Sequence, residues 1–197
     1  MSATNRGRVK LDDDAYETPP WAVERLLEKA DLPGGLWFEP CAGHGNIITA
    51  VRAARKDVTW AATEVREECL PRLKELGFDN GSIRDFLAFK WPLSPYDLTL
   101  SNPPFSFAQE FLEKALSMSQ HVAFLLRLNY LGSEKRQTFL KYNMPDVYVL
   151  PNRPSFAFGG TDATEYAWLV FHAHGQERGI VTVLNSTPLE VRRPKKT

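Results

Sequence analysis

The stretch Ser101-Asn102-Pro103-Pro104-Phe105 has the most distinctive chemistry in the sequence. It follows an apolar run, Tyr96 to Leu100, that is typical of a buried strand. Each proline lacks an N–H and keeps the residue before it extended, so the Pro103 carbonyl should point outward. The side-chain oxygen of Asn102 and this carbonyl would then form a cluster of acceptors, and Phe105 offers a flat apolar surface. Such a site suits a substrate NH2 group on an aromatic ring.

Three further segments carry candidate binding residues, each directly after a predicted strand. Residues 39–46, Glu-Pro-Cys-Ala-Gly-His-Gly-Asn, place two glycines before a predicted helix, where backbone can approach a ligand closely. Glu64 lies 19 residues beyond Gly45, the distance at which nucleotide-binding α/β folds hold ribose hydroxyls. Asp85 and Phe86 follow a third, weaker strand. In this order along the chain, the segments predict a nucleoside site.

Short apolar runs alternate with helical patterns, which predicts an α/β fold with a mostly parallel seven-stranded sheet and helices on both faces. We also expect a C-terminal antiparallel hairpin, over Gly179 to Leu184. Ligands of such folds bind at the carboxyl ends of the strands, where the candidate residues lie. The predicted strands cover residues 36–38, 58–63, 82–84, 96–100, 121–128, 146–150 and 166–172, and the predicted helices cover 19–30, 47–55, 67–76, 106–118 and 133–142.

The composition is ordinary for a soluble globular protein, with 43% hydrophobic and 24% charged residues in a chain of 197. No apolar run approaches the roughly 20 residues of a membrane span. Two cysteines and four scattered histidines indicate neither a disulfide framework nor a metal cluster. We therefore expect a cytoplasmic, metal-free domain over residues 15–185, between a flexible tail of residues 1–14 and a basic tail of residues 186–197.

Basic residues gather at both ends of the chain. Residues 1–10 and 191–197 hold seven of the 24 bases and none of the 24 acids, so residues 11–190 carry a formal charge of −7. Basic tails on an acidic body indicate contact with phosphate groups or, equally well, solvated ends of the chain.

Over roughly residues 15–172 the sequence resembles S-adenosylmethionine-dependent amino-methyltransferases, and most of all the small, phage-type DNA N6-adenine methyltransferases. SNPPF resembles their Asn-Pro-Pro-aromatic motif, and residues 39–46 resemble a cofactor loop that precedes this motif, as in the γ arrangement. The likeness extends to residues 16–21, 126–130, 151–156 and 161–168.

The resemblance implies S-adenosylmethionine as cofactor and roles for particular residues. It implies that Glu64 binds the cofactor ribose, that Asp85 and Phe86 contact its adenine, and that residues 16–21 touch its methionine end. The implied cofactor-binding residues are Tyr16, Thr18, Pro19, Glu39, Pro40, Ala42, Gly43, Gly45, Asn46, Glu64, Asp85, Phe86 and Asn102. The implied catalytic residues are Asn102, Pro103, Pro104 and Phe105, and the implied substrate-binding residues are Phe105, Tyr130, Arg153 and Phe156.

The chemistry of the motif agrees with these roles. An exocyclic amine is a poor nucleophile because its lone pair is shared with the ring. Fixed acceptors that hold its two N–H groups favour a tetrahedral nitrogen and stabilise the positive charge that grows there in the transition state. A base in duplex DNA would have to flip out of the helix to reach such a site.

Several alternatives share these residues. An adenine methyltransferase acting on RNA would use the same acceptors, and a protein glutamine methyltransferase uses a related motif, usually with Tyr as its aromatic. A silent nucleic-acid or cofactor binder is a further alternative, whereas a dehydrogenase would need the absent G-x-G-x-x-G turn. Because only about 25 residues follow His172, we expect no separate target-recognition domain, short or weak sequence specificity, and a monomer or homodimer.

Overall fold

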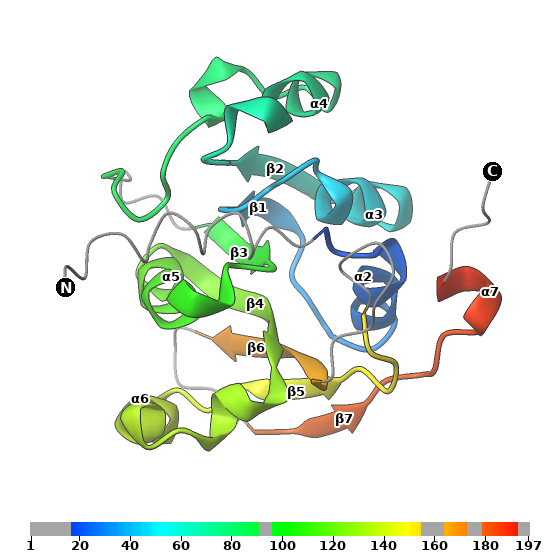
Figure 1. The fold of residues 1–197 in the computed structure, drawn as a ribbon, viewed down its shortest axis with the longest axis vertical. Coiled ribbons are helices and arrows are strands. Elements are labelled where there is room, and N and C mark those ends of the chain that lie inside the picture. Colours follow the sequence, from blue (N-terminus) through cyan, green and yellow to red (C-terminus); the bar gives the residue numbers. More distant parts are fainter. Residues whose placement is uncertain (1–16, 91–95, 155–163, 173–178, 193–197) are drawn as a thin grey trace, which may run out of the picture.

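The computed structural model describes residues 17–90, 96–154, 164–172 and 179–192. Its centre is a seven-stranded sheet with the strand order β2-β1-β3-β4-β6-β5-β7 (Figure 1). The strands are β1 Gly35–Glu39, β2 Val58–Ala62, β3 Tyr96–Ser101, β4 Ser119–Arg127, β5 Asp146–Val149, β6 Tyr166–His172 and β7 Val181–Val183. The helices are α2 Pro20–Leu27, α3 Asn46–Ala54, α4 Leu70–Glu75, α5 Ala108–Leu116, α6 Gln137–Tyr142 and α7 Leu189–Arg192.

The strand directions confirm the predicted, mostly parallel seven-stranded sheet. Strands β2, β1, β3 and β4 are parallel, and β6 lies antiparallel to both β4 and β5. The predicted hairpin over Gly179 to Leu184 is wrong, because this segment forms one strand, β7, parallel to β5. The carboxylate of Asp146 accepts hydrogen bonds from the N–H groups of Gly179 and Ile180, which aligns the segment with the start of β5. The predicted strand over residues 82–84 is reduced to one bridge between Glu64 and Ile83.

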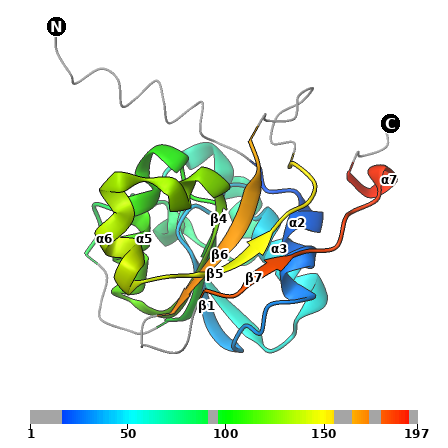
Figure 2. The ribbon, with the colours of Figure 1, turned by 90° about the horizontal axis from the view of Figure 1, so that it is seen from below.

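Helices cover both faces of the sheet, α2 and α3 on one and α5 and α6 on the other (Figure 2). Strand β4 shows why both faces need a cover, since its side chains alternate between two apolar cores. Ala123 and Leu125 belong to the core under α2 and α3, whereas Val122, Phe124 and Leu126 belong to the core under α5 and α6. None of the helices in the described ranges is both long and apolar enough to cross a bilayer.

Helix α2 shows how the local sequence determines where an element of this fold begins and which face it buries. Pro20 stands at its first position, where a missing N–H costs nothing, and the Pro19 carbonyl accepts the N–H of Ala22 at 3.0 Å. Trp21 and Leu26 bury one face of the helix against the sheet. Helix α2 thereby places the segment before it, which includes Thr18, beside the carboxyl ends of the strands.

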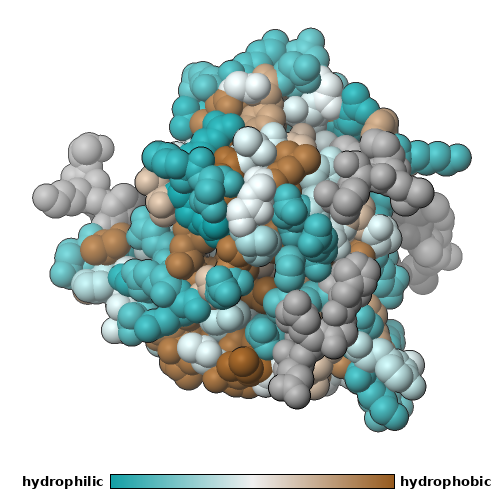
Figure 3. Space-filling view, turned by 180° about the vertical axis from the view of Figure 1, so that it is seen from behind, coloured by the Kyte–Doolittle hydropathy of each residue, from teal (hydrophilic) through white to brown (hydrophobic). Residues whose placement is uncertain are grey.

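The molecular surface is mostly hydrophilic on the face shown in Figure 3, with apolar side chains in small patches. The exposed large apolar residues of the described ranges are Val65, Tyr142, Met144, Ile180, Val181, Val183, Leu189 and Val191.

Candidate active site

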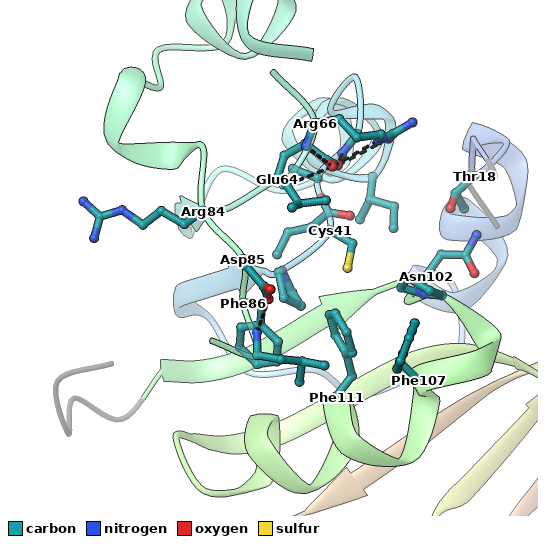
Figure 4. Close-up of a pocket in the computed structure, with 18 of the residues that line it drawn as sticks. Thr18, Cys41, Glu64, Arg66, Arg84, Asp85, Phe86, Asn102, Phe107 and Phe111 are labelled. Atoms are coloured by element: carbon teal, nitrogen blue, oxygen red, sulfur yellow. Dashed lines mark hydrogen bonds and ion pairs between the residues drawn. The ribbon is translucent and has the colours of Figure 1, made fainter. Parts of the chain in front are cut away.

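A cavity of about 260 Å³ opens where β1, β2 and β3 end (Figure 4). This volume is many times the roughly 30 Å³ that a water molecule occupies, so the cavity can hold an organic ligand. Many of the predicted site residues meet in its wall. They are Thr18, Glu39, Pro40, Ala42, Gly43, Asn46, Glu64, Asp85, Phe86, Asn102 and Pro104.

The loop after β1 is held by backbone hydrogen bonds to the end of β2. The Ala42 N–H donates to the Thr63 carbonyl at 2.9 Å, and the Thr63 N–H donates to the Glu39 carbonyl at 2.8 Å. Gly45 ends the loop with φ 76°, and a Cβ added there would lie 2.2 Å from Cδ1 of Leu76. The position therefore favours glycine for its backbone angle, and a larger residue would also have to displace the end of the Leu76 side chain. Gly45 ends the loop at the start of α3 and is not itself in the cavity wall.

Glu64 is a buried carboxylate with a fixed orientation. Its oxygens accept the backbone N–H groups of Gly43 at 2.7 Å, Val65 at 2.9 Å and Arg66 at 3.0 Å. The Arg66 guanidinium adds a salt bridge at 3.1 Å (Figure 4). Five hydrogen bonds hold the carboxylate in place at the end of β2, so a ligand hydroxyl group would have to replace one of these donors to bind it.

Glu39 contributes a second buried carboxyl group, only 1% exposed. Its Oε2 atom accepts no hydrogen bond from the residues that the structure describes. Burial, together with the charges of Glu64 and Glu17, raises the pKa of this carboxyl well above its usual range. An uncompensated buried carboxyl in the cavity wall favours a ligand that carries positive charge.

Glu17 connects the segment before α2 to the loop after β1. One of its carboxylate oxygens lies 2.5 Å from His44 Nδ1, and the other accepts the Asn46 side-chain N–H at 2.5 Å. The sequence reasoning missed this pair of contacts, because 27 residues separate Glu17 from His44 and no periodic pattern relates them. Further cavity residues that it left without a cofactor-binding or catalytic role are Cys41, Ile47, Val65, Arg66, Arg84, Leu87, Phe107 and Phe111.

The part of the cavity around Phe86 is aromatic. Asp85 and Phe86 lie across the cavity from Asn102 and Thr18 (Figure 4). The ring of Phe86 packs 5.0 Å from that of Phe111, and the Asp85 carboxylate accepts the N–H of the second residue after it at 2.8 Å. The cavity wall thus offers both apolar rings suited to a flat ligand ring and carboxyl groups suited to a cation.

The SNPPF segment borders this cavity directly after β3. Asn102 and Pro104 are in the cavity wall, whereas Pro103 is buried beside them. Phe105 is half-buried outside the cavity, with its ring 5.6 Å from that of Tyr166 and 4.9 Å from the Arg127 guanidinium. Asn102 of the motif therefore borders the cavity, whereas the ring of Phe105 lies outside it.

Other predicted residues lie away from the cavity. Pro19 precedes α2, and Tyr130 is buried in the core under α5, where its hydroxyl donates to Gln109 Oε1 at 2.5 Å. Arg153 forms an exposed salt bridge with Glu165. A contact of Tyr130 or Arg153 with substrate stays a prediction. Tyr16, Phe156 and the tail of residues 1–14 lie outside the described residues. Within the described ranges, no group of three His, Cys, Asp or Glu side chains could hold a metal ion.

No family model matches the sequence, and no curated protein matches it either. Solved structures do resemble it. A Pyrococcus horikoshii protein described as an RNA methyltransferase superposes with a TM-score of 0.61 and 23% identity, over 87% of this chain and 90% of that one. A type I restriction-modification methyltransferase subunit from Streptococcus thermophilus superposes with a TM-score of 0.58 and 17% identity, over 80% of this chain and 45% of that one.

A dimethyladenosine transferase from Plasmodium falciparum also resembles the chain, with a TM-score of 0.56 and 13% identity over 80% of this chain and 62% of that one. At these identities the likeness establishes the fold, which is that of the S-adenosylmethionine-dependent methyltransferases and confirms the predicted fold class.

Proposed function

We propose that the protein transfers a methyl group from S-adenosylmethionine to the exocyclic N6 amine of adenine in DNA. One observation carries the proposal. Asn102 of the SNPPF segment borders the same cavity as Glu64 and the glycine loop, so an amine acceptor site and a nucleoside site meet at the ends of β1, β2 and β3.

The cavity wall suits each part of this cofactor. Glu64 is the acceptor for ribose hydroxyls, and the aromatic end around Phe86 receives the adenine ring. Glu39 and Glu17 also line the cavity and favour the ammonium and sulfonium charges. S-adenosylmethionine, when bound, supplies a methyl group on a sulfonium, which makes that methyl electrophilic.

The protein's own contribution is to hold and polarise the amine. The Asn102 side-chain oxygen and the Pro103 carbonyl accept its two N–H groups and keep the nitrogen lone pair directed at the methyl group. Positive charge develops on this nitrogen, so acceptors fixed by two prolines stabilise the transition state more than the ground state. The methylated nitrogen is acidic enough to lose its proton to water. No strong general base is needed.

The identity of the substrate rests on the motif and on the kind of proteins that share the fold. The SNPPF sequence favours an adenine-type amine, and the structural neighbours include subunits of type I restriction-modification systems. Other neighbours are named as RNA methyltransferases and as a dimethyladenosine transferase, so adenine in RNA is the second candidate. With DNA as substrate, the adenine must flip out of the duplex, at a cost of roughly a few kcal/mol.

The test is methyl transfer by the purified full chain from radiolabelled S-adenosylmethionine. The acceptors are unmethylated duplex DNA, structured ribosomal RNA and a glutamine-containing peptide, and mass spectrometry of the digests identifies the modified group. We expect N6-methyladenine in the DNA. N6-methyladenine in the RNA alone would assign the enzyme to RNA, and a methylated glutamine would reject adenine as the substrate.

Asn102→Ala tests the acceptor site separately. Loss of one preorganised polar contact to the transition state costs roughly 100-fold or more in kcat. We expect this loss with the cofactor dissociation constant changed less than about five-fold, as measured by calorimetry. The exposed Asn80→Ala is the matched control. Nearly full activity in Asn102→Ala would reject this assignment of the amine site.

A further inference from the structure

The aromatic ring of the SNPPF segment is held by two residues that the motif does not include. Phe105 packs 5.6 Å from the ring of Tyr166, and the Arg127 guanidinium lies over the Phe105 ring at 4.9 Å. Tyr166 is fully buried in the core under α2 and α3, whereas Arg127 and Phe105 are half-buried. The Phe105 ring is therefore in contact with both a buried aromatic of the core and a cation.

Arg127 is itself fixed by the sheet. It ends β4 and stands opposite Tyr166, the first residue of β6, in the antiparallel register. Its Nε donates to the Tyr166 hydroxyl at 3.3 Å. The next residue continues the tie, because the Leu128 N–H donates to the Glu165 carbonyl at 3.0 Å. A guanidinium anchored in this way holds an aromatic ring more firmly than a lone solvated cation does.

We propose that Arg127 is a positioning residue of the acceptor site, which fixes the plane of the Phe105 ring and through it the substrate base. This inference rests on the proposed function. The cavity wall includes Asn102 and Pro104 but not Phe105, so the cavity does not set the angle of that ring. Instead, Arg127 at the end of β4 and Tyr166 at the start of β6 determine the angle of the Phe105 ring. The amine that Asn102 holds points at the methyl group only while the base stacked on this ring keeps its plane.

The chain offers a matched control for this contact. The Arg55 guanidinium lies 5.1 Å from the ring of Trp37, and its Nη1 donates to the Leu32 carbonyl at 2.9 Å. Arg55 stands before β2, at the end of the sheet opposite the cavity. Arg55→Lys therefore removes the same kind of contact, a planar cation over an aromatic ring, from a place remote from the acceptor site.

The experiment compares Arg127→Lys with Arg55→Lys, using the DNA or RNA that the wild-type protein methylates. Lysine keeps the charge but loses the flat guanidinium and the Nε donor. We expect kcat at saturating substrates to fall roughly ten-fold in Arg127→Lys, the effect of about 1.4 kcal/mol in the transition state. We expect the S-adenosylmethionine dissociation constant and the melting temperature to stay at the wild-type values. Arg55→Lys should keep the wild-type kcat.

Tyr166→Phe is the second variant, because it removes only the hydroxyl that anchors Arg127. It should lower kcat in the same direction and by a smaller factor. A wild-type kcat in Arg127→Lys would overturn the inference and leave the proposed function intact. A weaker cofactor affinity or a lower melting temperature that accounts for the loss of activity would also overturn it, because that pattern indicates a structural role. Absence of methyl transfer by the wild-type protein to either nucleic acid would overturn the proposed function and this inference together.

Discussion

The carboxylate of Glu64 accepts the backbone N–H of Gly43 at 2.7 Å, across 21 residues of sequence. A single side chain at the end of β2 thus holds the loop after β1 and also faces the cavity. Its structural and ligand-binding roles are therefore coupled, and a substitution must be chosen that separates them.

Glu64→Gln keeps the shape of the side chain and removes its charge. A charge-assisted hydrogen bond contributes roughly 1.5–3 kcal/mol, so we expect the dissociation constant for S-adenosylmethionine to rise at least about ten-fold. Glu64→Ala should also unfold at a lower temperature, because it leaves the Gly43 N–H and the Arg66 guanidinium without their acceptor. Calorimetry and thermal melts measure the two effects, and the exposed Glu75→Gln is the control. An unchanged dissociation constant in Glu64→Gln would contradict the assigned role.

Three glycine substitutions separate backbone strain from steric overlap. Gly45 and Gly77 both have positive φ, 76° and 89°, but a Cβ on Gly45 would overlap Leu76 whereas a Cβ on Gly77 would meet nothing within 4 Å. We expect Gly77→Ala to cost about 1 kcal/mol of unfolding free energy and Gly45→Ala roughly 2–4 kcal/mol. Gly132→Ala has open space and no positive φ, so it should be close to neutral. Urea unfolding measures all three, and equal costs at Gly45 and Gly77 would contradict the close approach of Leu76 to Gly45.

Glu39 makes the stability of the ligand-free protein depend on pH. Burial raises the pKa of its carboxyl in the folded state, so its neutral form is favoured by folding. The contribution to stability is fully present below the unfolded-state pKa of about 4.3 and is lost as pH rises through the higher, folded-state pKa. Glu39→Gln removes this loss. We expect the variant to melt roughly 3–6 °C above the wild type at pH 8, with a smaller difference at pH 5.

The same substitution should weaken cofactor binding, since a cationic ligand end would favour the ionised form of Glu39, which glutamine cannot adopt. The exposed Glu24→Gln is the control and should change neither property. A Glu39→Gln variant that is less stable than the wild type at pH 8 would show that the ionised carboxyl is compensated in the folded protein.

The two cysteines should react slowly with thiol reagents in the native protein. Burial and the charges of Glu64 and Glu39 raise the pKa of Cys41, and burial raises that of Cys69 to about 11. The reactive thiolate is therefore scarce at pH 8. We expect labelling by Ellman's reagent at least roughly ten-fold slower than in the denatured chain, which should release two equivalents. Fast labelling of the native protein would contradict the raised pKa of the thiols.

Much of the fold was predictable because local patterns determine it. The run at Tyr166 to His172 is apolar on both sides, as a central strand must be, and prolines and glycines mark the ends of the helices. The direction of β7 was not predictable. It depends on the contact of Asp146 with the Gly179 and Ile180 N–H groups, which joins residues 33 and 34 positions apart.

The candidate site also combines residues that were predictable from the sequence with contacts that were not. Residues that directly follow a strand, such as Glu39, Glu64 and Asn102, were found from sequence because the end of a strand fixes their place. The contact of Glu17 with His44 and the cation–π contact of Arg127 with Phe105 were not predicted, because both join side chains of segments that are distant in the sequence. For Phe105 the sequence predicted an exposed stacking surface, whereas the ring is half-buried and in contact with Arg127 and Tyr166.

The two prolines after Asn102 have a consequence for anyone who follows this site in solution. Neither residue has an amide hydrogen, so the centre of the proposed acceptor niche gives no signal in amide-detected NMR spectra and no reading in hydrogen–deuterium exchange. Its occupancy must be observed through neighbours, above all the side-chain NH2 resonances of Asn102. The segment of greatest chemical interest is spectroscopically silent along its own backbone.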